Sequence, residues 1–194
     1  MRVLKLVVCL VAVFGFSRLY AEPESDPSAT VEAYYELLRS SDYVGVASMF
    51  DPTELSEFRG VLRVLEENPS ESDQEFMKTV FGPDITAEKL KAMSDSEYFS
   101  TFLNLIFQQL QAANGFSFDG VEIIGSVNEG DEKAHVVIRQ TVGLGENPVE
   151  LLDVVPLTLV DGDWKLAMKG DIKGIAAALS ASLQGQSNRP AVLP

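Results

Sequence analysis

Cysteine and histidine are nearly absent from this chain of 194 residues, which contains one of each. Cys9 lies in a segment that we expect to be removed, so the remaining chain has no thiol for disulfides, for a nucleophile or for a thiolate zinc site. Because His135 is the single histidine, a pair of histidine metal ligands is excluded, and it is the one residue that could serve as the histidine of a Ser-His-Asp triad. We therefore expect stability to come from an apolar core, and we expect no metal and no other cofactor.

Two common sequence motifs of enzymes are also missing. Gly143-x-Gly145 lacks a third glycine and runs into Pro148 and a strand, so it is not a dinucleotide fingerprint. The chain has no Gly-x-Ser-x-Gly elbow of the kind that carries a serine nucleophile. No motif in the chain specifies a reaction.

Basic residues are scarce as well. The chain has 15 Lys and Arg against 29 Asp and Glu, a formal net charge of −14. Without its first 21 residues it retains 12 basic residues against 29 acidic ones, a formal charge of −17. Such a field repels nucleic-acid backbones and anionic lipid surfaces, so we expect no nucleic-acid partner. Solubility is sufficient to explain the charge.

The leading apolar run is too short for a membrane span. Leu6 to Phe16 comprises 11 residues, whereas a spanning helix needs about 20. Arg2 and Lys5 precede the run and Ala21 offers a small residue for cleavage, so 1–21 predicts a secretory signal peptide. We expect export to the periplasm or the extracellular space, with cleavage after about Ala21 and no membrane insertion afterwards.

Helical signals fill the first half of the remaining chain. Asp26-Pro27 and Asp51-Pro52 each pair a capping Asp with a Pro at the first helical position. Ser94 and Glu97 form a capping box, and Asn114-Gly115 closes the helix that follows it. The apolar spacing predicts helices over 27–38, 43–50, 52–65, 75–81, 86–93 and 95–114, with a loop over 66–73.

The hydrophobic period changes from 3.6 to 2 after Gly115. It predicts strands over 116–127, 133–142, 149–160 and 164–169, and an Ala-rich helix over 171–183. Short links between the strands favour antiparallel neighbours. The expected fold is α+β: a single domain over 22–184, with N-terminal helices on one face of a curved four-stranded antiparallel sheet. A disordered tail is expected over 185–194.

Two segments carry a family resemblance. The helical start over 28–43 and the hairpin over 155–166, in which a strand turns through Asp161-Gly162 and returns on Trp164, resemble the nuclear transport factor two-like (cystatin-like) superfamily. The resemblance implies a cone in which a bent sheet wraps a helix around an internal pocket, and homodimers that pair through the sheet. Glu66 to Met93 then looks like an insertion. The superfamily holds isomerases, cyclases and exported domains without known activity, so it leaves function open.

His135 and Arg139 share one face of the second expected strand, opposite Ala134, Val136 and Ile138. If the aliphatic face packs on the helices, His135 and Arg139 face solvent or a partner. If the sheet curls the other way, both line the pocket, where His135 is a candidate general base and Arg139 a candidate ligand contact.

Asp153 is an acid in an otherwise apolar strand row. Facing the pocket, it would be a partly desolvated carboxylate and a candidate catalytic acid or base. The alternatives are a bulge at Asp153, or a sheet buried on its other face through Leu152 and Val154. Arg139 is expected opposite residue 152, give or take two, so an Arg139–Asp153 ion pair is a further hypothesis.

Aromatic side chains are the other candidates for a binding site. Tyr34, Tyr35, Phe118 and Trp164 would line an apolar ligand site, although at their spacings they would equally serve as core. The acidic hairpin loops at 128–132 and 161–163 lack the ligand spacing of a calcium loop, and turn chemistry explains them better.

Three functions remain open. The leading hypothesis is an exported non-catalytic domain that binds an apolar small molecule or a protein partner. The second is a small cofactor-free lyase or isomerase, with Asp153 as base and His135 or a tyrosine polarising the substrate. The third is a structural or assembly factor of the cell envelope.

Overall fold

The structure is a computed structural model that describes residues 26–67, 69–144, 147–170, 172–174, 176–178 and 181. The expected signal peptide at 1–21 and the expected tail at 185–194 lie outside these ranges. None of the helices in the described ranges combines the length and the apolar character needed to cross a bilayer.

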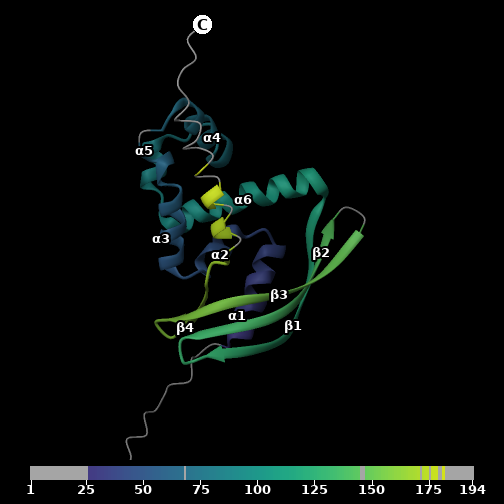
Figure 1. Cartoon of the computed structure of the whole chain (residues 1–194). Coiled ribbons are helices and arrows are strands. Elements are labelled where there is room, and N and C mark those ends of the chain that lie inside the picture. The colour runs from purple at the N-terminus through teal and green to yellow at the C-terminus, as the bar shows by residue number, and fades with distance from the viewer. Residues whose placement is uncertain are drawn as a thin grey trace, which may run out of the picture.

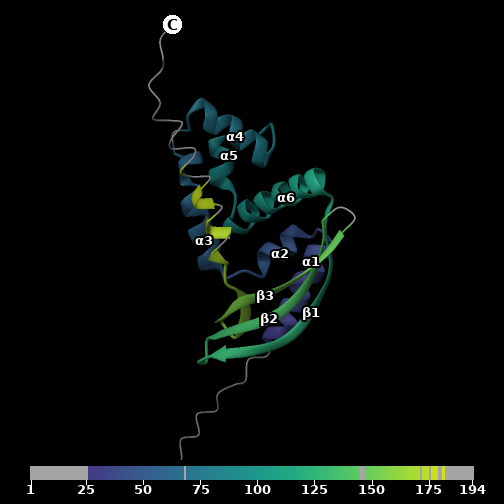
Figure 2. The same cartoon turned by 45° about the vertical axis from the view of Figure 1, so that its right-hand side comes forward.

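The fold is α+β, as predicted: helices come first along the chain and an antiparallel sheet follows (Figure 1). The elements are α1 (Pro27–Arg39), α2 (Tyr43–Ser48), α3 (Pro52–Val61), the 3₁₀ turn η1 (Arg63–Leu65), α4 (Glu71–Phe81), α5 (Ala87–Ala92), α6 (Asp95–Asn114), β1 (Phe116–Glu129), β2 (Lys133–Leu144), β3 (Asn147–Val160) and β4 (Asp163–Leu166). Figure 2 shows the sheet bending around α1, with α4 and α5 at the end of the molecule farthest from the sheet.

The predicted helix starts are confirmed by their capping bonds. The Asp26 carboxylate accepts the Ser28 N–H at 3.0 Å, and the Asp51 carboxylate accepts the Thr53 N–H at 2.8 Å. Each bond satisfies one of the N–H groups that a helix N-terminus leaves without an internal partner. At its other end, α6 stops at Gly115, which adopts the left-handed conformation at φ 60°.

The stretch from 52 to 73 differs from the prediction. Helix α3 ends at Val61, and Leu62 and Leu65 follow it but are fully buried all the same. The loop expected over 66–73 is shorter, because Ser70 and Asp73 form a capping box that starts α4 at Glu71. The Ser70 side chain accepts the Asp73 N–H at 3.2 Å, and the Asp73 carboxylate accepts the Ser70 N–H at 2.8 Å.

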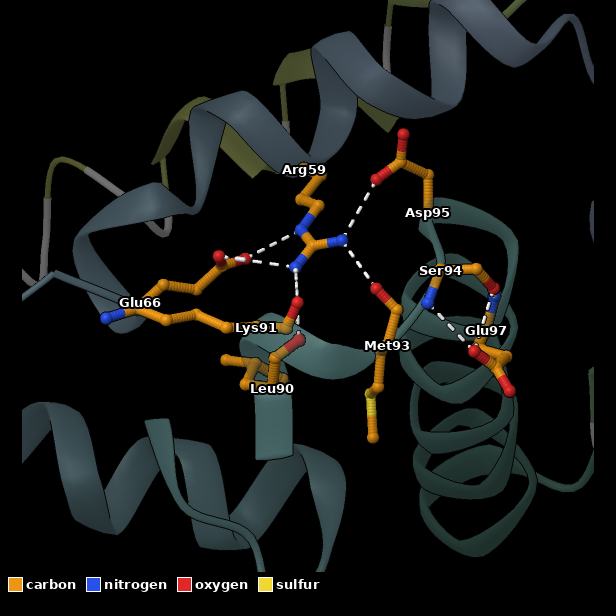
Figure 3. A network of polar contacts seen from close by, with 8 residues as sticks. All are labelled: Arg59, Glu66, Leu90, Lys91, Met93, Ser94, Asp95 and Glu97. Carbon is orange, nitrogen blue, oxygen red and sulfur yellow. Dashed lines mark hydrogen bonds and ion pairs between the residues drawn. The ribbon is translucent and has the colours of Figure 1, made fainter. Parts of the chain in front are cut away.

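Arg59 joins α3, α5 and α6 through a network of polar contacts (Figure 3). Its guanidinium donates to Glu66 at 2.8 Å and to Asp95 at 3.1 Å. It also donates to the backbone carbonyls of residues 90, 91 and 93, at 2.6 to 3.1 Å. These carbonyls lie at the C-terminal end of α5, where a helix lacks internal donors and carries partial negative charge. Hydrogen bonds to Glu66 and Asp95 outweigh the effect of burial and raise the pKa of Arg59.

The four strands form one meander in the order β1-β2-β3-β4, all antiparallel. The predicted Asp161-Gly162 turn links β3 to β4, with both residues at positive φ (53° and 94°), as a two-residue hairpin turn requires. Strand β4 ends at Leu166, three residues earlier than expected. Register shifts in β1, between 118 and 120 and between 123 and 125, interrupt its pairing with β2.

The two faces of the sheet have opposite environments. Ala134, Val136 and Ile138 of β2 are fully buried, as are Val155 and Leu157 of β3 within a few per cent. These residues belong to the same core as buried side chains of α1, α3 and α6. On the opposite face of the sheet, exposed apolar side chains include Val127, Leu152 and Val154. The helices therefore cover one face, and among the described residues nothing comparable covers the other.

The segment after β4 returns to the helices. Its described residues between 170 and 181 are helical, in the region where a last helix is predicted. Lys173 forms ion pairs with Glu54 and Glu57 of α3, at 2.5 and 3.1 Å. At the start of this return, Asp51 donates its N–H to the Leu166 carbonyl at 2.9 Å. These contacts fix the path of the chain over the covered side of the sheet.

Candidate functional site

A cavity of about 240 Å³ lies between α1 and the covered face of the sheet. Its lining comes from elements far apart in the sequence: Tyr34, Tyr35 and Leu38 from α1, Phe50 from the link between α2 and α3, Phe116 and Phe118 from β1, Gln140 and Val142 from β2, Leu151, Asp153 and Val155 from β3, and Leu166, Ala167, Lys169 and Ile172 from the end of β4 and beyond. The lining is mostly apolar, with a few polar groups, which is the usual composition of a small-molecule site.

Aromatic rings form one wall of the cavity and hold one another edge to face. The Tyr34 and Tyr35 ring centroids are 5.0 Å apart, Tyr35 and Phe118 are 6.0 Å apart, and Phe116 and Phe118 are 5.0 Å apart. The interplanar angles lie between 79° and 86°. Such T-shaped contacts add to the stability from burial and limit ring motion. The wall is therefore a preformed surface for an apolar ligand.

The polar groups of the cavity include an ion pair on its β3 side. The Asp153 carboxylate pairs with the Lys169 ammonium through one oxygen, and its other oxygen accepts the Val154 N–H at 2.7 Å. The side chains of Asp153 and Lys169 are 33% and 26% exposed, so water reaches both. Both carboxylate oxygens are thus already engaged, and a proton-transfer role would have to compete with these bonds.

Tyr35 supplies a second polar group. Its hydroxyl donates to the Gln140 side-chain oxygen at 3.0 Å. Burial, and to a smaller extent the charges of Tyr34 and Asp153, raise the pKa of Tyr35 well above its ordinary value. The phenol is therefore neutral at physiological pH and remains a hydrogen-bond donor, because ionisation would place a phenolate in a desolvated site.

His135 and Arg139 lie on the uncovered face of the sheet, away from the cavity. His135 contacts Glu129 at 2.8 Å, and Arg139 forms an ion pair with Glu122. Of the two arrangements that the sequence left open, the structure has the one in which the aliphatic residues of β2 face the helices. His135 is therefore not positioned to act with Asp153.

The hypothetical Arg139–Asp153 ion pair does not form. Arg139 is directly opposite Leu152 in the β2–β3 register, at the centre of the range of residues that the sequence predicts. Residues directly opposite one another share a face, and successive residues alternate between faces. Arg139 therefore shares the outer face with Leu152, while Asp153 points to the covered side and pairs with Lys169.

Asp153 occupies the inward row, so the two alternatives for it do not apply. The β2–β3 register runs without a shift from Lys133 to Leu144, which excludes a bulge at Asp153. Leu152 and Val154 are 70% and 46% exposed, so the other face is not the buried one.

The aromatic candidates separate into two groups. Tyr34, Tyr35 and Phe118 line the cavity, whereas Trp164 is 5% exposed and belongs to the hydrophobic core.

Sequence reasoning missed Gln140 and Lys169. Gln140 is a polar interruption in the inward row between Ile138 and Val142, which is a signal that could have found it. Lys169 follows the last strand, and its place depends on the path of the chain.

No cluster of three or more His, Cys, Asp or Glu side chains within the described ranges is arranged to hold a metal ion. The chain matches no protein-family model and no curated protein sequence. The resemblance to the nuclear transport factor two-like superfamily, and with it the insertion over 66–93, stays a prediction.

Proposed function

We propose that this chain is an exported domain that binds a small, mostly apolar molecule in the cavity between α1 and the sheet, and that it catalyses no reaction. The observation that carries the proposal is the preformed aromatic wall beside the Asp153–Lys169 ion pair. The volume of about 240 Å³ lies just below the range of roughly 300–1,000 Å³ for small-molecule sites. The ligand is accordingly small, with an apolar body and one polar group.

The Asp153–Lys169 pair offers two ways to bind the polar group of the ligand. A ligand carboxylate would take Lys169 from Asp153, whereas a ligand amine would take Asp153 from Lys169. The two classes are separated by Lys169→Met and Asp153→Asn, because each substitution removes the partner of one class only. A thermal-shift screen with small aromatic carboxylic acids and amines provides the probes.

A matched pair of variants tests the place of binding. Leu151 lines the cavity at 44% exposure, and Leu152 points to the opposite face of the same strand. Leu151→Trp should fill the cavity mouth and abolish the thermal shift of any hit, whereas Leu152→Trp should leave it unchanged. Equal responses of the two variants, or no hit with the wild type, would count against the proposal.

The lyase or isomerase remains the second candidate, because Tyr35 and Asp153 line the same cavity. In that case Asp153 would act as base and the neutral Tyr35 phenol would polarise the substrate. Asp153→Asn distinguishes the two functions with any hit of the screen. An enzyme should lose turnover of that compound by orders of magnitude, whereas a binder shows no turnover in either form, whatever the change in affinity.

A further inference from the structure

Strand β3 is paired with β4 over only part of its length. The β3–β4 register covers Leu157 to Val160, and one further bond joins the Ala167 N–H to the Pro156 carbonyl at 3.0 Å. Strand β3 itself begins at Asn147. From there to Val155 it has β2 on one side and no strand on the other within the described ranges.

The direction of each backbone group along this edge follows from two bonds. The Pro156 carbonyl faces β4, because it accepts from Ala167, and the Leu159 N–H faces β2, because it donates to the Glu132 carbonyl at 2.8 Å. Backbone groups of an antiparallel strand alternate between its two neighbours. The β2–β3 register has no shift, so Glu150, Leu152 and Val154 direct their N–H and C=O groups away from β2.

The positions of proline in β3 agree with this alternation. The backbone nitrogens of Pro148 and Pro156 both face away from β2. The N–H that proline lacks is therefore not one that would bond to β2. The two prolines enclose the open segment, and they block strand addition at its ends. Between the two prolines, the backbone N–H and C=O groups of Glu150 and Leu152 have no hydrogen-bond partner among the described residues, so they are available to an added strand. The Val154 N–H is occupied by the Asp153 carboxylate.

Beside the charged Glu150 and Asp153, three apolar side chains of the open segment are exposed, and they lie on both faces of the sheet. Leu152 is 70% exposed, Val154 46% and Leu151 44%. Natural proteins usually protect an edge strand with charges, bulges or a covering element. Strand β1, at the other edge of the sheet, has two register shifts that interrupt it in this way. An open edge that carries exposed leucine and valine has the features of a surface for strand addition.

We propose that the edge of β3 between Pro148 and Pro156 binds an extended segment of a partner protein, which adds to the sheet as a further antiparallel strand. The segment would form up to five backbone bonds, two at Glu150, two at Leu152 and one at the Val154 carbonyl. Its side chains opposite Val154, Leu152 and Glu150 lie on the uncovered face. The first two positions are therefore apolar, and the third is Lys or Arg.

Charge favours a basic partner over a second copy of this chain. Glu150 is exposed in the middle of the open edge, and the chain has a net charge of −14. A second copy would bring the same negative charge to the interface, whereas a segment with the pattern apolar-x-apolar-x-Lys/Arg complements it. This inference is independent of the ligand in the cavity.

Hydrogen exchange gives a first test that needs no partner. The amides of Glu150 and Leu152 should exchange quickly in the free protein, whereas those of Leu151 and Val155, which face β2, should be protected. Slow exchange at Glu150 and Leu152 in dilute protein would show that the edge is already covered, and would overturn the proposal.

The second test uses a random heptapeptide library displayed on phage. Phage that bind the Leu152→Pro variant are first removed from the library, and the remaining phage are then selected for binding to the wild type. Leu152→Pro removes an N–H that no bond to β2 uses, so we expect a melting temperature close to that of the wild type. Enriched peptides should carry the pattern apolar-x-apolar-x-Lys/Arg, and their affinity for Leu152→Pro should be at least tenfold lower.

Two controls keep the result interpretable if Leu152→Pro does not fold. Leu152→Ala keeps the N–H and should retain most of the affinity. A synthetic copy of the best peptide, N-methylated at the residue opposite Leu152, should bind the wild type at least tenfold more weakly than the unmodified peptide. Equal binding of both peptides would refute strand addition. A wild-type dimer in sedimentation that Leu152→Pro dissociates would show that a second copy of this chain occupies the edge, and would overturn the proposal of a basic partner.

Discussion

Replacing Arg59 should destabilise the protein more than any other single loss of charge on α3. Arg59→Met keeps an unbranched side chain of similar helix propensity but removes all the hydrogen-bond donors of the guanidinium. It leaves Glu66, whose side chain is only 12% exposed, without its counter-ion, and it leaves the end of α5 without donors for three carbonyls. Breaking a buried ion pair by removing one partner costs about 3–5 kcal/mol.

The expected loss lies at the lower end of that range. Asp95 is 36% exposed, so water replaces much of its interaction with Arg59. We therefore expect the free energy of unfolding to fall by about 3 kcal/mol, and the melting temperature to fall by on the order of 10 °C. Urea unfolding followed by circular dichroism measures the change, provided that the slope m is the same as in the wild type.

Arg63→Met is the matched control. Arg63 pairs with Glu67 at 3.9 Å, and the two side chains are 68% and 64% exposed. Such a pair contributes less than about 0.5 kcal/mol. If Arg59→Met and Arg63→Met lie within 1 kcal/mol of each other (roughly the value of one ordinary hydrogen bond), the network of Figure 3 does not hold α3, α5 and α6 together as described.

Further predictions concern glycines and buried tyrosines. Gly60→Ala should stabilise the protein by up to about 1 kcal/mol, because a Cβ at this position on α3 would meet nothing within 4 Å. Gly45→Ala should destabilise it, because the added Cβ would lie 2.6 Å from the Asp42 carboxylate that caps α2. Thermal unfolding of the two variants compares these effects. Burial is the main cause that raises the pKa of Tyr35 and Tyr98, so the stability they contribute is present below about pH 10 and is lost as pH rises further. Tyr98→Phe should lessen that loss by about 1 kcal/mol between pH 10 and 11, and at pH 7 it should not destabilise, since the Tyr98 hydroxyl is buried without a hydrogen-bond partner among the described residues. An unchanged pH dependence of urea unfolding in Tyr98→Phe would contradict this reasoning.

Local signals in the sequence were sufficient for the order and type of nearly all elements. Capping residues, helical spacing and a change to strict alternation after Gly115 act within a few residues of the chain, so they predicted α1, α6 and the four-stranded meander. The start of α4 was missed because Asp73 takes the place of the usual Glu or Gln in its capping box. The end of α3 was missed because Leu62 and Leu65 continue the apolar spacing although the backbone leaves the α-helix.

By itself, the sequence determined that Asp153 and Arg139 alternate with their neighbours, and it placed Arg139 opposite residue 152 to within two residues. Only the tertiary structure decided which of the two alternating rows faces the helices, because strand alternation is symmetric until one face is buried. That choice put Asp153 beside the cavity and placed His135 and Arg139 outside. The Asp153–Lys169 pair likewise depends on the path of the chain after β4, which long-range contacts such as the bond from Asp51 to Leu166 direct.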